Sequence, residues 1–136
     1  VDGNHIPNIA KCSHEYFYWA GHCYSFESIA LTQSDAELAC EQRNANLVWI
    51  TSDYENNMLQ SIAQDTNTTD FWIGMSDIVE DGKFVWVKGG QGSYSNWDAE
   101  YPKDLDDHNC VVQDMEGVWK NAVCGQKKAY SCKYKP

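Results

Sequence analysis

Residues 96–124 read NWDAEYPKDLDDHNCVVQDMEGVWKNAVC, and this stretch decides the fold. It contains two tryptophans, two cysteines and a dense set of Asp, Asn and Lys side chains. The segment over 89–109, rich in Gly, Ser, Asn and Asp, shows no hydrophobic periodicity. A segment of about twenty residues without periodicity is unusual inside a compact domain and is normally functional. The sequence therefore predicts a long functional loop over 89–109, followed by a strand over 110–115.

Regular elements are expected before and after this loop. Two helices are predicted at capping sequences, the first at Thr32 or Ser34 and the second at Ser52, where Glu55 completes a capping box. Apolar residues recur at helical spacing after each cap. A hairpin over 12–23 and short apolar or alternating runs predict strands over 23–26, 45–50, 71–75, 83–87 and 130–134.

The composition indicates a single acidic domain. A chain of 136 residues can bury one modest core, and its many aromatic rings are expected to fill that core. The formal net charge of −10 argues against binding to nucleic acid, because binders of phosphate backbones present clustered Lys and Arg. No run of about 18 apolar residues occurs, so no membrane span is expected.

The start of the chain and one short motif indicate the secretory route. Residues 1–11 are polar and irregular, which predicts a loosely held lead-in before a single domain over 12–136. The chain begins at Val1, and we expect it to be a mature secreted form whose signal has been removed. The triplet Asn67-Thr68-Thr69 is an N-glycosylation sequon in a polar stretch, which predicts a surface loop.

Six cysteines in a short chain are typical of a disulfide framework formed in an oxidising compartment. A structural zinc site is the competing interpretation, but the spacings match no zinc finger or knuckle. Sequence alone allows 15 pairings of six cysteines. An even number of cysteines leaves no thiol for a disulfide-linked dimer if all of them pair within the chain.

Several motifs of the chain resemble the C-type lectin-like domain family, from Cys12 to Cys132. They are Trp72-Ile73-Gly74-Met75, Asn96-Trp97, Trp119 with Cys124 five residues later, and the spacing of the six cysteines. The resemblance implies an α+β fold in which two helices pack on antiparallel sheets, with a long ligand-binding loop region. It also implies that the tryptophans at positions like those of the family's core tryptophans are buried, namely Trp72, Trp86, Trp97 and Trp119. It also implies the disulfides Cys12–Cys23, Cys40–Cys132 and Cys110–Cys124, of which the second would contribute on the order of 4–5 kcal/mol.

Sugar-binding members of this family hold a calcium ion that grips two sugar hydroxyls, and this chain departs from their ligand set. Where they carry Glu-Pro-Asn or Gln-Pro-Asp, often with a cis proline, this chain has Tyr101-Pro102-Lys103. Their Trp-Asn-Asp stretch is replaced by Trp119-Lys120-Asn121, and His108 stands at an acidic position. Lysine has no acceptor atom, and two ammonium groups beside a divalent cation would repel it. We therefore expect no calcium at the usual sugar site.

A polar site remains at these positions. We expect Lys103 and Lys120 to pair with Asp104 and Asp106, so that the loop keeps its shape without metal and binds sugar hydroxyls directly. The ring of Tyr101 would offer an aromatic face to a pyranose. The alternative is a surface network without a ligand. The predicted carbohydrate-binding residues are Tyr101, Lys103, Asp104, His108, Asn109, Lys120 and Asn121.

A second metal position is a further hypothesis. Acidic residues gather in this stretch, and family members can bind structural calcium beside the sugar site. The metal candidates are Asp104, Asp106 and Asp107, with Asp98 and Glu100 nearby. The same residues also fit a solvated acidic face.

The function expected from the resemblance is a secreted lectin that binds glycans or glycoproteins without calcium at the usual site. Recognition of microbial surfaces in innate immunity and agglutination belong to this expectation, and multivalency would require a non-covalent homo-oligomer. The alternative is a protein-binding domain that uses the same loop. Against it, the only arginine, Arg43, is expected on the first helix, far from the loop. Mineral or ice binding lacks a periodic Thr or Asp array. No nucleophile elbow, phosphate loop or catalytic carboxylate pair predicts an enzyme.

Overall fold

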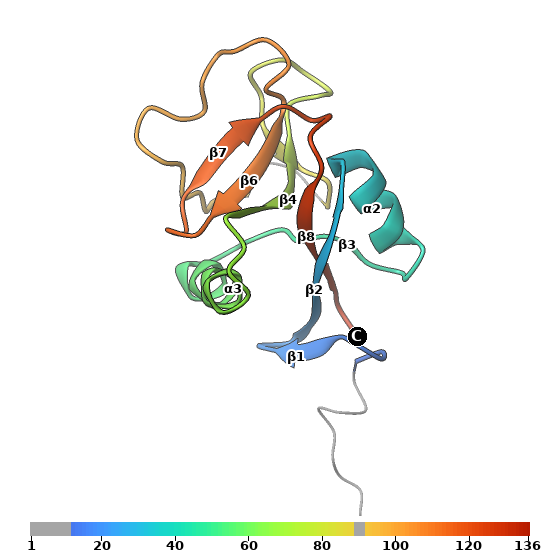
Figure 1. Ribbon diagram of the computed structural model, residues 1–136. Coiled ribbons are helices and arrows are strands. Elements are labelled where there is room, and N and C mark those ends of the chain that lie inside the picture. The colour runs from blue at the N-terminus through green and yellow to red at the C-terminus, as the bar shows by residue number, and fades with distance from the viewer. Residues whose placement is uncertain (1–11, 89–91) are drawn as a thin grey trace, which may run out of the picture.

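A computed structural model describes residues 12–88 and 92–136 (Figure 1). The predicted lead-in over 1–11 lies outside the described residues. The two predicted helices are present, together with eight strands in the described part of the chain. In chain order the elements are β1 (Phe17–Trp19), β2 (His22–Leu31), α2 (Gln33–Glu41), β3 (Asn46–Leu47), α3 (Asp53–Asp65), β4 (Asp70–Ser76), β5 (Val85–Trp86), β6 (Cys110–Asp114), β7 (Trp119–Ala122) and β8 (Lys128–Tyr134).

The strands form one mixed sheet with the order β1-β2-β8-β4-β6-β7. β3 joins β8, and β5 joins β4. All pairs are antiparallel except β4 with β8, so the expected antiparallel sheets are joined through one parallel pair. Most of the described residues between β5 and β6 lie at one end of the molecule, and β1 lies at the other (Figure 1). This separation places the long loop on its own face.

Both helices begin at the predicted caps. The Thr32 hydroxyl accepts the amide of Asp35 at 3.3 Å, and the Ser52 hydroxyl accepts the amide of Glu55 at 3.1 Å. The Glu55 carboxylate accepts the backbone amide of Thr51 at 2.8 Å instead of that of Ser52, so the capping box closes one residue earlier. In the described residues, neither helix is long and apolar enough to cross a membrane.

The tryptophans fill the core as expected, and Trp119 is at its centre. Trp72 and Trp119 have no exposed surface, Trp86 is buried, and Trp97 is half-buried. The rings of Trp86 and Trp97 contact the Trp119 ring edge-on, with centroids 5.3 and 5.9 Å away. Trp119 therefore links the body of the domain to the start of the site region.

Three local predictions need correction. The strands expected over 45–50 and 83–87 shorten to β3 and β5, and β7 was not predicted because Lys120 and Asn121 have low strand propensity. β7 forms because pairing with β6 buries Trp119 and Asn121 on one face. Arg43 is not on the first helix: α2 ends at Glu41, and Arg43 lies in the turn that follows.

The three disulfides implied by the resemblance are all present. Cys12 bonds to Cys23, Cys40 to Cys132 and Cys110 to Cys124. All six cysteines are used, and none is free. The last disulfide ties β6 to the segment after β7, and this fixes the base of the long loop.

A buried ion pair holds α3 against β8. The Lys133 ammonium donates to the Glu55 carboxylate and to the backbone carbonyl of Trp49 at 3.0 Å. The same carboxylate accepts the hydroxyl of Tyr24. Burial lowers the pKa of Lys133, and it raises the pKa of Tyr24. The pair is a structural clamp between α3 and the sheet.

Candidate functional site

The site region begins where the long loop adds to the edge of β7. The backbone amide of Trp119 donates to the Asn96 carbonyl at 2.9 Å, and the amide of Asp98 donates to the Trp119 carbonyl at 3.0 Å. These bonds form a short parallel bridge between Trp97 and Trp119. The motif tryptophans therefore position the residues that follow them.

Asn121 holds the middle of the loop through its side-chain amide. Its Oδ1 accepts the backbone amide of Lys103 at 2.9 Å, and its Nδ2 donates to the carbonyls of Lys103 at 2.7 Å and His108 at 2.9 Å. The residue is buried. The Tyr101–Pro102 peptide bond beside it is cis, which is the isomer that sugar-binding members of the family often have at this proline. Asn121 thus positions the loop backbone, and its amide hydrogens are already used.

Lys120 does not pair as expected. Its Nζ lies 3.1 Å from an Asp114 carboxylate oxygen and 3.6 Å from one of Asp98, so the predicted partners Asp104 and Asp106 are wrong for this residue. The reason is the register: Lys120 is opposite Val112 on β6, and Asp114, two residues further, is its diagonal neighbour on the same face. The hydrogen bond to Asp114 is the main cause of the raised pKa of Lys120.

Lys103 lies over the ring of Tyr101. Its Nζ is 4.7 Å from the ring centroid, and that of Lys120 is 5.9 Å from it. Within the described residues Lys103 forms no ion pair, so its predicted pairing with Asp104 is also absent. A half-buried tyrosine ring with ammonium groups within about 6 Å is a cation–π arrangement. The Lys103 ammonium is therefore exposed and available to a ligand.

A cavity of about 320 Å³ lies beside this group and collects four of the predicted residues: Lys103, Asp104, His108 and Asn109. Asp77 and Asp81 also line it, and the sequence analysis missed both. Ser76 of β4 pairs with Cys110 of β6, so Asp77 follows one strand where Asn109 precedes the other. The Asp77 amide donates to the Asn109 carbonyl at 3.0 Å. The only feature of the sequence that could have indicated Asp77 is its position directly after a buried strand.

Asp77 is the most constrained acid in this cavity. It is 6% exposed, and one carboxylate oxygen accepts the amide of Gly82 at 2.8 Å. The other oxygen is buried and has no hydrogen-bond partner among the described residues. A buried polar atom without a partner is uncommon in folded proteins. Asp77 therefore brings an unpaired, buried carboxylate oxygen to the wall of the cavity.

Only one of the three predicted calcium ligands lines the cavity. Asp104 lines the cavity, whereas Asp106 and Asp107 are exposed and do not. The Asp106 carbonyl lies 2.8 Å from the Nδ1 of His108. The oxygen donors around the cavity are of the type that calcium prefers. Over residues 12–88 and 92–136, however, no three His, Cys, Asp or Glu side chains are grouped so that they could hold a metal ion. Calcium at this second position stays a prediction.

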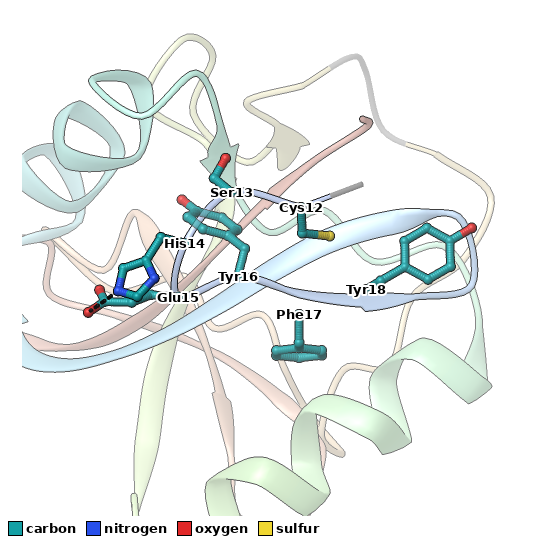
Figure 2. Close-up of a pocket in the computed structure, with 7 residues that line it drawn as sticks. All are labelled: Cys12, Ser13, His14, Glu15, Tyr16, Phe17 and Tyr18. Atoms are coloured by element: carbon teal, nitrogen blue, oxygen red, sulfur yellow. Dashed lines mark ion pairs between the residues drawn. The ribbon is translucent and has the colours of Figure 1, made fainter. Parts of the chain in front are cut away.

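Another cavity, of about 440 Å³, lies at the N-terminal hairpin and contains none of the predicted site residues (Figure 2). Its lining runs from Cys12 to Tyr18, and in it His14 lies 3.7 Å from Glu15. We assign this cavity no role.

Comparison with known proteins identifies the fold family. The family model described as "Lectin C-type domain" matches residues 29–134. The alpha-N-acetylgalactosamine-specific lectin of Patiria pectinifera is 28% identical in an alignment that covers 85% of this chain and 76% of the relative. The human C-type mannose receptor 2 is 31% identical over 84% of this chain, which spans only 8% of the receptor's length.

A solved structure of a similar domain has the same fold. The carbohydrate-recognition domain of cow CD23, crystallised in the presence of a GlcNAc2Man3 oligosaccharide, superposes with a TM-score of 0.85 at 31% identity. The match covers 92% of this chain and 96% of that domain. The chain therefore belongs to the C-type lectin domain family, whose members are generally binding proteins and not enzymes.

Proposed function

We propose that this domain binds glycans through its long loop region without calcium at the usual sugar site. The proposal rests on one observation: Lys103, whose ammonium forms no ion pair among the described residues and lies over the Tyr101 ring, lines a cavity together with polar residues such as Asp104, His108 and Asn109. An ammonium donates hydrogen bonds to sugar hydroxyls, and carboxylates such as Asp104 accept them. An aromatic ring packs against the apolar face of a pyranose.

The similar proteins support the ligand class. One relative is named as a lectin specific for alpha-N-acetylgalactosamine, and the CD23 domain was crystallised in the presence of an oligosaccharide. The identity of the sugar is a separate question, because the side chains at the usual sugar site differ from those expected of calcium-dependent members.

The charges support independence from calcium. Lys103 and Lys120 stand where the resemblance expects metal ligands, and an ammonium repels a divalent cation at short range. The amide of Asn121, at another expected ligand position, already serves the loop backbone. Few acceptor atoms therefore remain at that position for a metal.

The test is a glycan array run with calcium and again with excess EDTA. We expect the same glycans to bind in both conditions, and the Lys103→Ala variant to lose at least tenfold in affinity, because a hydrogen bond to a charged group contributes about 1.5–3 kcal/mol. The matched control is Lys135→Ala, which removes an exposed lysine next to the C-terminus, and the C-terminus lies at the end of the molecule where β1 lies (Figure 1). Binding that disappears with EDTA would contradict the proposal.

Secretion is the second part of the proposal. Three disulfides are typical of proteins that fold in an oxidising compartment. A secreted lectin of this kind would recognise glycoproteins or microbial surfaces, a role in innate immunity. If it agglutinates cells, its subunits must associate without covalent bonds, because no cysteine is free. Sedimentation of the purified chain measures this association directly.

A protein ligand is the second candidate, and apolar side chains at the same end favour it. Val79 is 90% exposed, Ile78 is 65% exposed, and Leu105 lines the cavity with half of its surface exposed. Exposed apolar groups near one another often mark protein interfaces. An array that stays silent in both conditions would favour this candidate. It would then be tested on a panel of purified cell-surface proteins, with Val79→Ser expected to weaken the contact.

A further inference from the structure

The sequon Asn67-Thr68-Thr69 lies on the surface between α3 and β4. Asn67 and Thr69 are both exposed, and Asn67 has a positive φ of 55° in the turn that ends α3. Its backbone amide donates to the Gln64 carbonyl at 3.1 Å. Among the described residues its side-chain amide makes no hydrogen bond, whereas the hydroxyls of Thr66 and Thr68 bond to each other at 2.8 Å. The carboxamide of Asn67 is therefore free for modification.

A polar cavity opens beside this side chain. It has a volume of about 400 Å³, and all three sequon residues line it together with groups from β2 and β8. Lys127 is exposed, and Lys128 is held by the Asp70 carboxylate at 3.0 Å. The Ser28 side chain, from the exposed part of β2, also borders it. Hydroxyl and ammonium groups next to a free asparagine suit the polar hydroxyls of a sugar attached there.

The position leaves the long loop accessible. Asn67 precedes the first residue of β4, whereas the site cavity begins at Asp77, directly after its last residue. β4 has seven residues, so at about 3.3 Å per residue its two ends are roughly 20 Å apart. A glycan at Asn67 would project from the end of the strand opposite to the candidate site.

We propose that Asn67 carries an N-linked oligosaccharide whose first sugar residues lie in this cavity. The inference depends on the secretory route proposed above and not on glycan binding by the loop. In the reaction the Asn67 side-chain nitrogen forms a bond to the anomeric carbon of an oligosaccharide carried on a lipid diphosphate. The bond from that carbon to the phosphate oxygen breaks, the lipid diphosphate leaves with the electron pair, and the amide loses one proton. A glycosyltransferase of the secretory pathway supplies the catalysis.

The first experiment measures the intact mass of the chain secreted from eukaryotic cells behind a secretion signal. We expect a mass above the 15.5 kDa of the sequence. Peptide N-glycosidase should remove the added mass, because it releases the glycan and converts Asn67 to aspartate. Asn67→Gln and Thr69→Ala should abolish the added mass. Thr68→Ala is the matched control and should keep it, because the middle position of a sequon accepts any residue except proline.

Each outcome decides a different proposal. Wild-type protein in the medium at the bare sequence mass would overturn the glycosylation and leave secretion intact. Protein that carries the glycan but stays inside the cell would support the modification and count against secretion. Added mass that persists in Asn67→Gln would place the sugar elsewhere and overturn the assignment.

The second experiment tests the cavity. The glycan is trimmed enzymatically to its first sugar, and hydrogen exchange is compared with that of Asn67→Gln. We expect slower exchange of the backbone amides at residues 127–129 in the trimmed glycoprotein, because the sugar would cover them. Equal exchange rates would mean that the sugar extends into solvent, which would overturn the cavity contact.

Discussion

At the scale of single residues, Asn121 decides the shape of the candidate site. Its amide satisfies one donor and two acceptors of the loop backbone, at Lys103 and His108. Buried polar groups that lose a partner cost about 1–3 kcal/mol. We expect Asn121→Asp to lower the free energy of unfolding by about this amount, because a carboxylate of the same shape would face two carbonyl oxygens. Urea denaturation measures the change.

The control for this prediction is Asn57→Asp, the same replacement on the exposed side of α3. Surface substitutions of this kind usually change stability by less than about 0.5 kcal/mol. Equal losses in the two variants would show that Asn121 does not hold the loop. If only the Asn121→Asp variant loses stability, it should also bind glycans more weakly, because the loop backbone that carries Lys103 would lose its support. This effect does not require contact between the Asn121 side chain and the sugar.

Glu37 on α2 should titrate near neutrality. Burial and a hydrogen bond that the protonated Glu37 carboxyl donates to the neighbouring Glu41 raise the pKa of Glu37 from 4.5 to about 7. Between these two values the folded state binds more protons than the unfolded chain, so the stability that this group provides is present at low pH and is lost as the pH rises towards 7. Carboxyl resonances followed by NMR give the pKa directly.

Glu41→Gln tests the cause of that shift. It removes the neighbouring charge, and the pKa of Glu37 should fall, although desolvation, the larger cause, keeps it above its ordinary value. Glu116→Gln, which replaces an exposed glutamate elsewhere, should leave the pKa of Glu37 unchanged. A Glu37 pKa near 4.5 in the wild type would contradict the prediction.

Residue patterns located part of the site. Tyr101, Lys103 and Lys120 stand out because lysine and tyrosine replace metal ligands in a recognisable motif. The partners of Lys120 could not be predicted, because nearness in sequence pointed to Asp104 and Asp106, while the register of β6 and β7 brings Asp114. Asp77 could not be predicted either, since only the pairing of β4 with β6 places it beside Asn109.

At the scale of elements, the ion pair between Glu55 and Lys133 fixes α3 to the sheet. Both side chains are almost fully buried, at 3% and 2% exposure. Breaking a buried pair by removing one partner typically costs about 3–5 kcal/mol, because the other charge stays buried without compensation. We expect Lys133→Met to destabilise the domain by this amount, as measured by urea denaturation.

The double variant Glu55→Gln with Lys133→Met separates charge from packing. If the loss comes from an uncompensated charge, the double variant should be more stable than Lys133→Met alone. Equal stability of the single and double variants would assign the effect to packing against Trp49 and Tyr24. Asp70→Asn, which breaks the half-buried pair with Lys128, is the matched control and should cost far less.

Elements with strong local signals were predicted well. The caps at Thr32 and Ser52 mark the helix starts because a side-chain oxygen near the first free amides is a local requirement. β7 lacked such a signal, since its four residues form a strand only through pairing with β6 and burial of Trp119. Short strands of this kind are products of tertiary structure, and the pattern of their residues is too brief to indicate them.

At the scale of the whole molecule, the fold could be anticipated because six cysteines and four tryptophans recur at spacings typical of one family. The cavity could not, because it forms between a loop that follows β4 and a loop that precedes β6. Local patterns specify which residues are buried. Only the complete topology specifies which polar residues share a pocket.

The last prediction concerns how the disulfides stabilise the whole chain. Cys40–Cys132 joins residues 92 positions apart, and Cys12–Cys23 joins residues 11 apart. In the chain-entropy model the longer loop contributes about 4.6 kcal/mol and the shorter about 2.8, because closing a longer loop removes more freedom from the unfolded state. We expect the double variant Cys40→Ala, Cys132→Ala to lose about 2 kcal/mol more than Cys12→Ala, Cys23→Ala in urea denaturation. Cys12 is half-buried and the other three cysteines are fully or almost fully buried, so the loss of packing also favours the larger effect for Cys40→Ala, Cys132→Ala. Equal losses would mean that native contacts around each bond, and not the constraint on the unfolded chain, determine what the disulfides contribute.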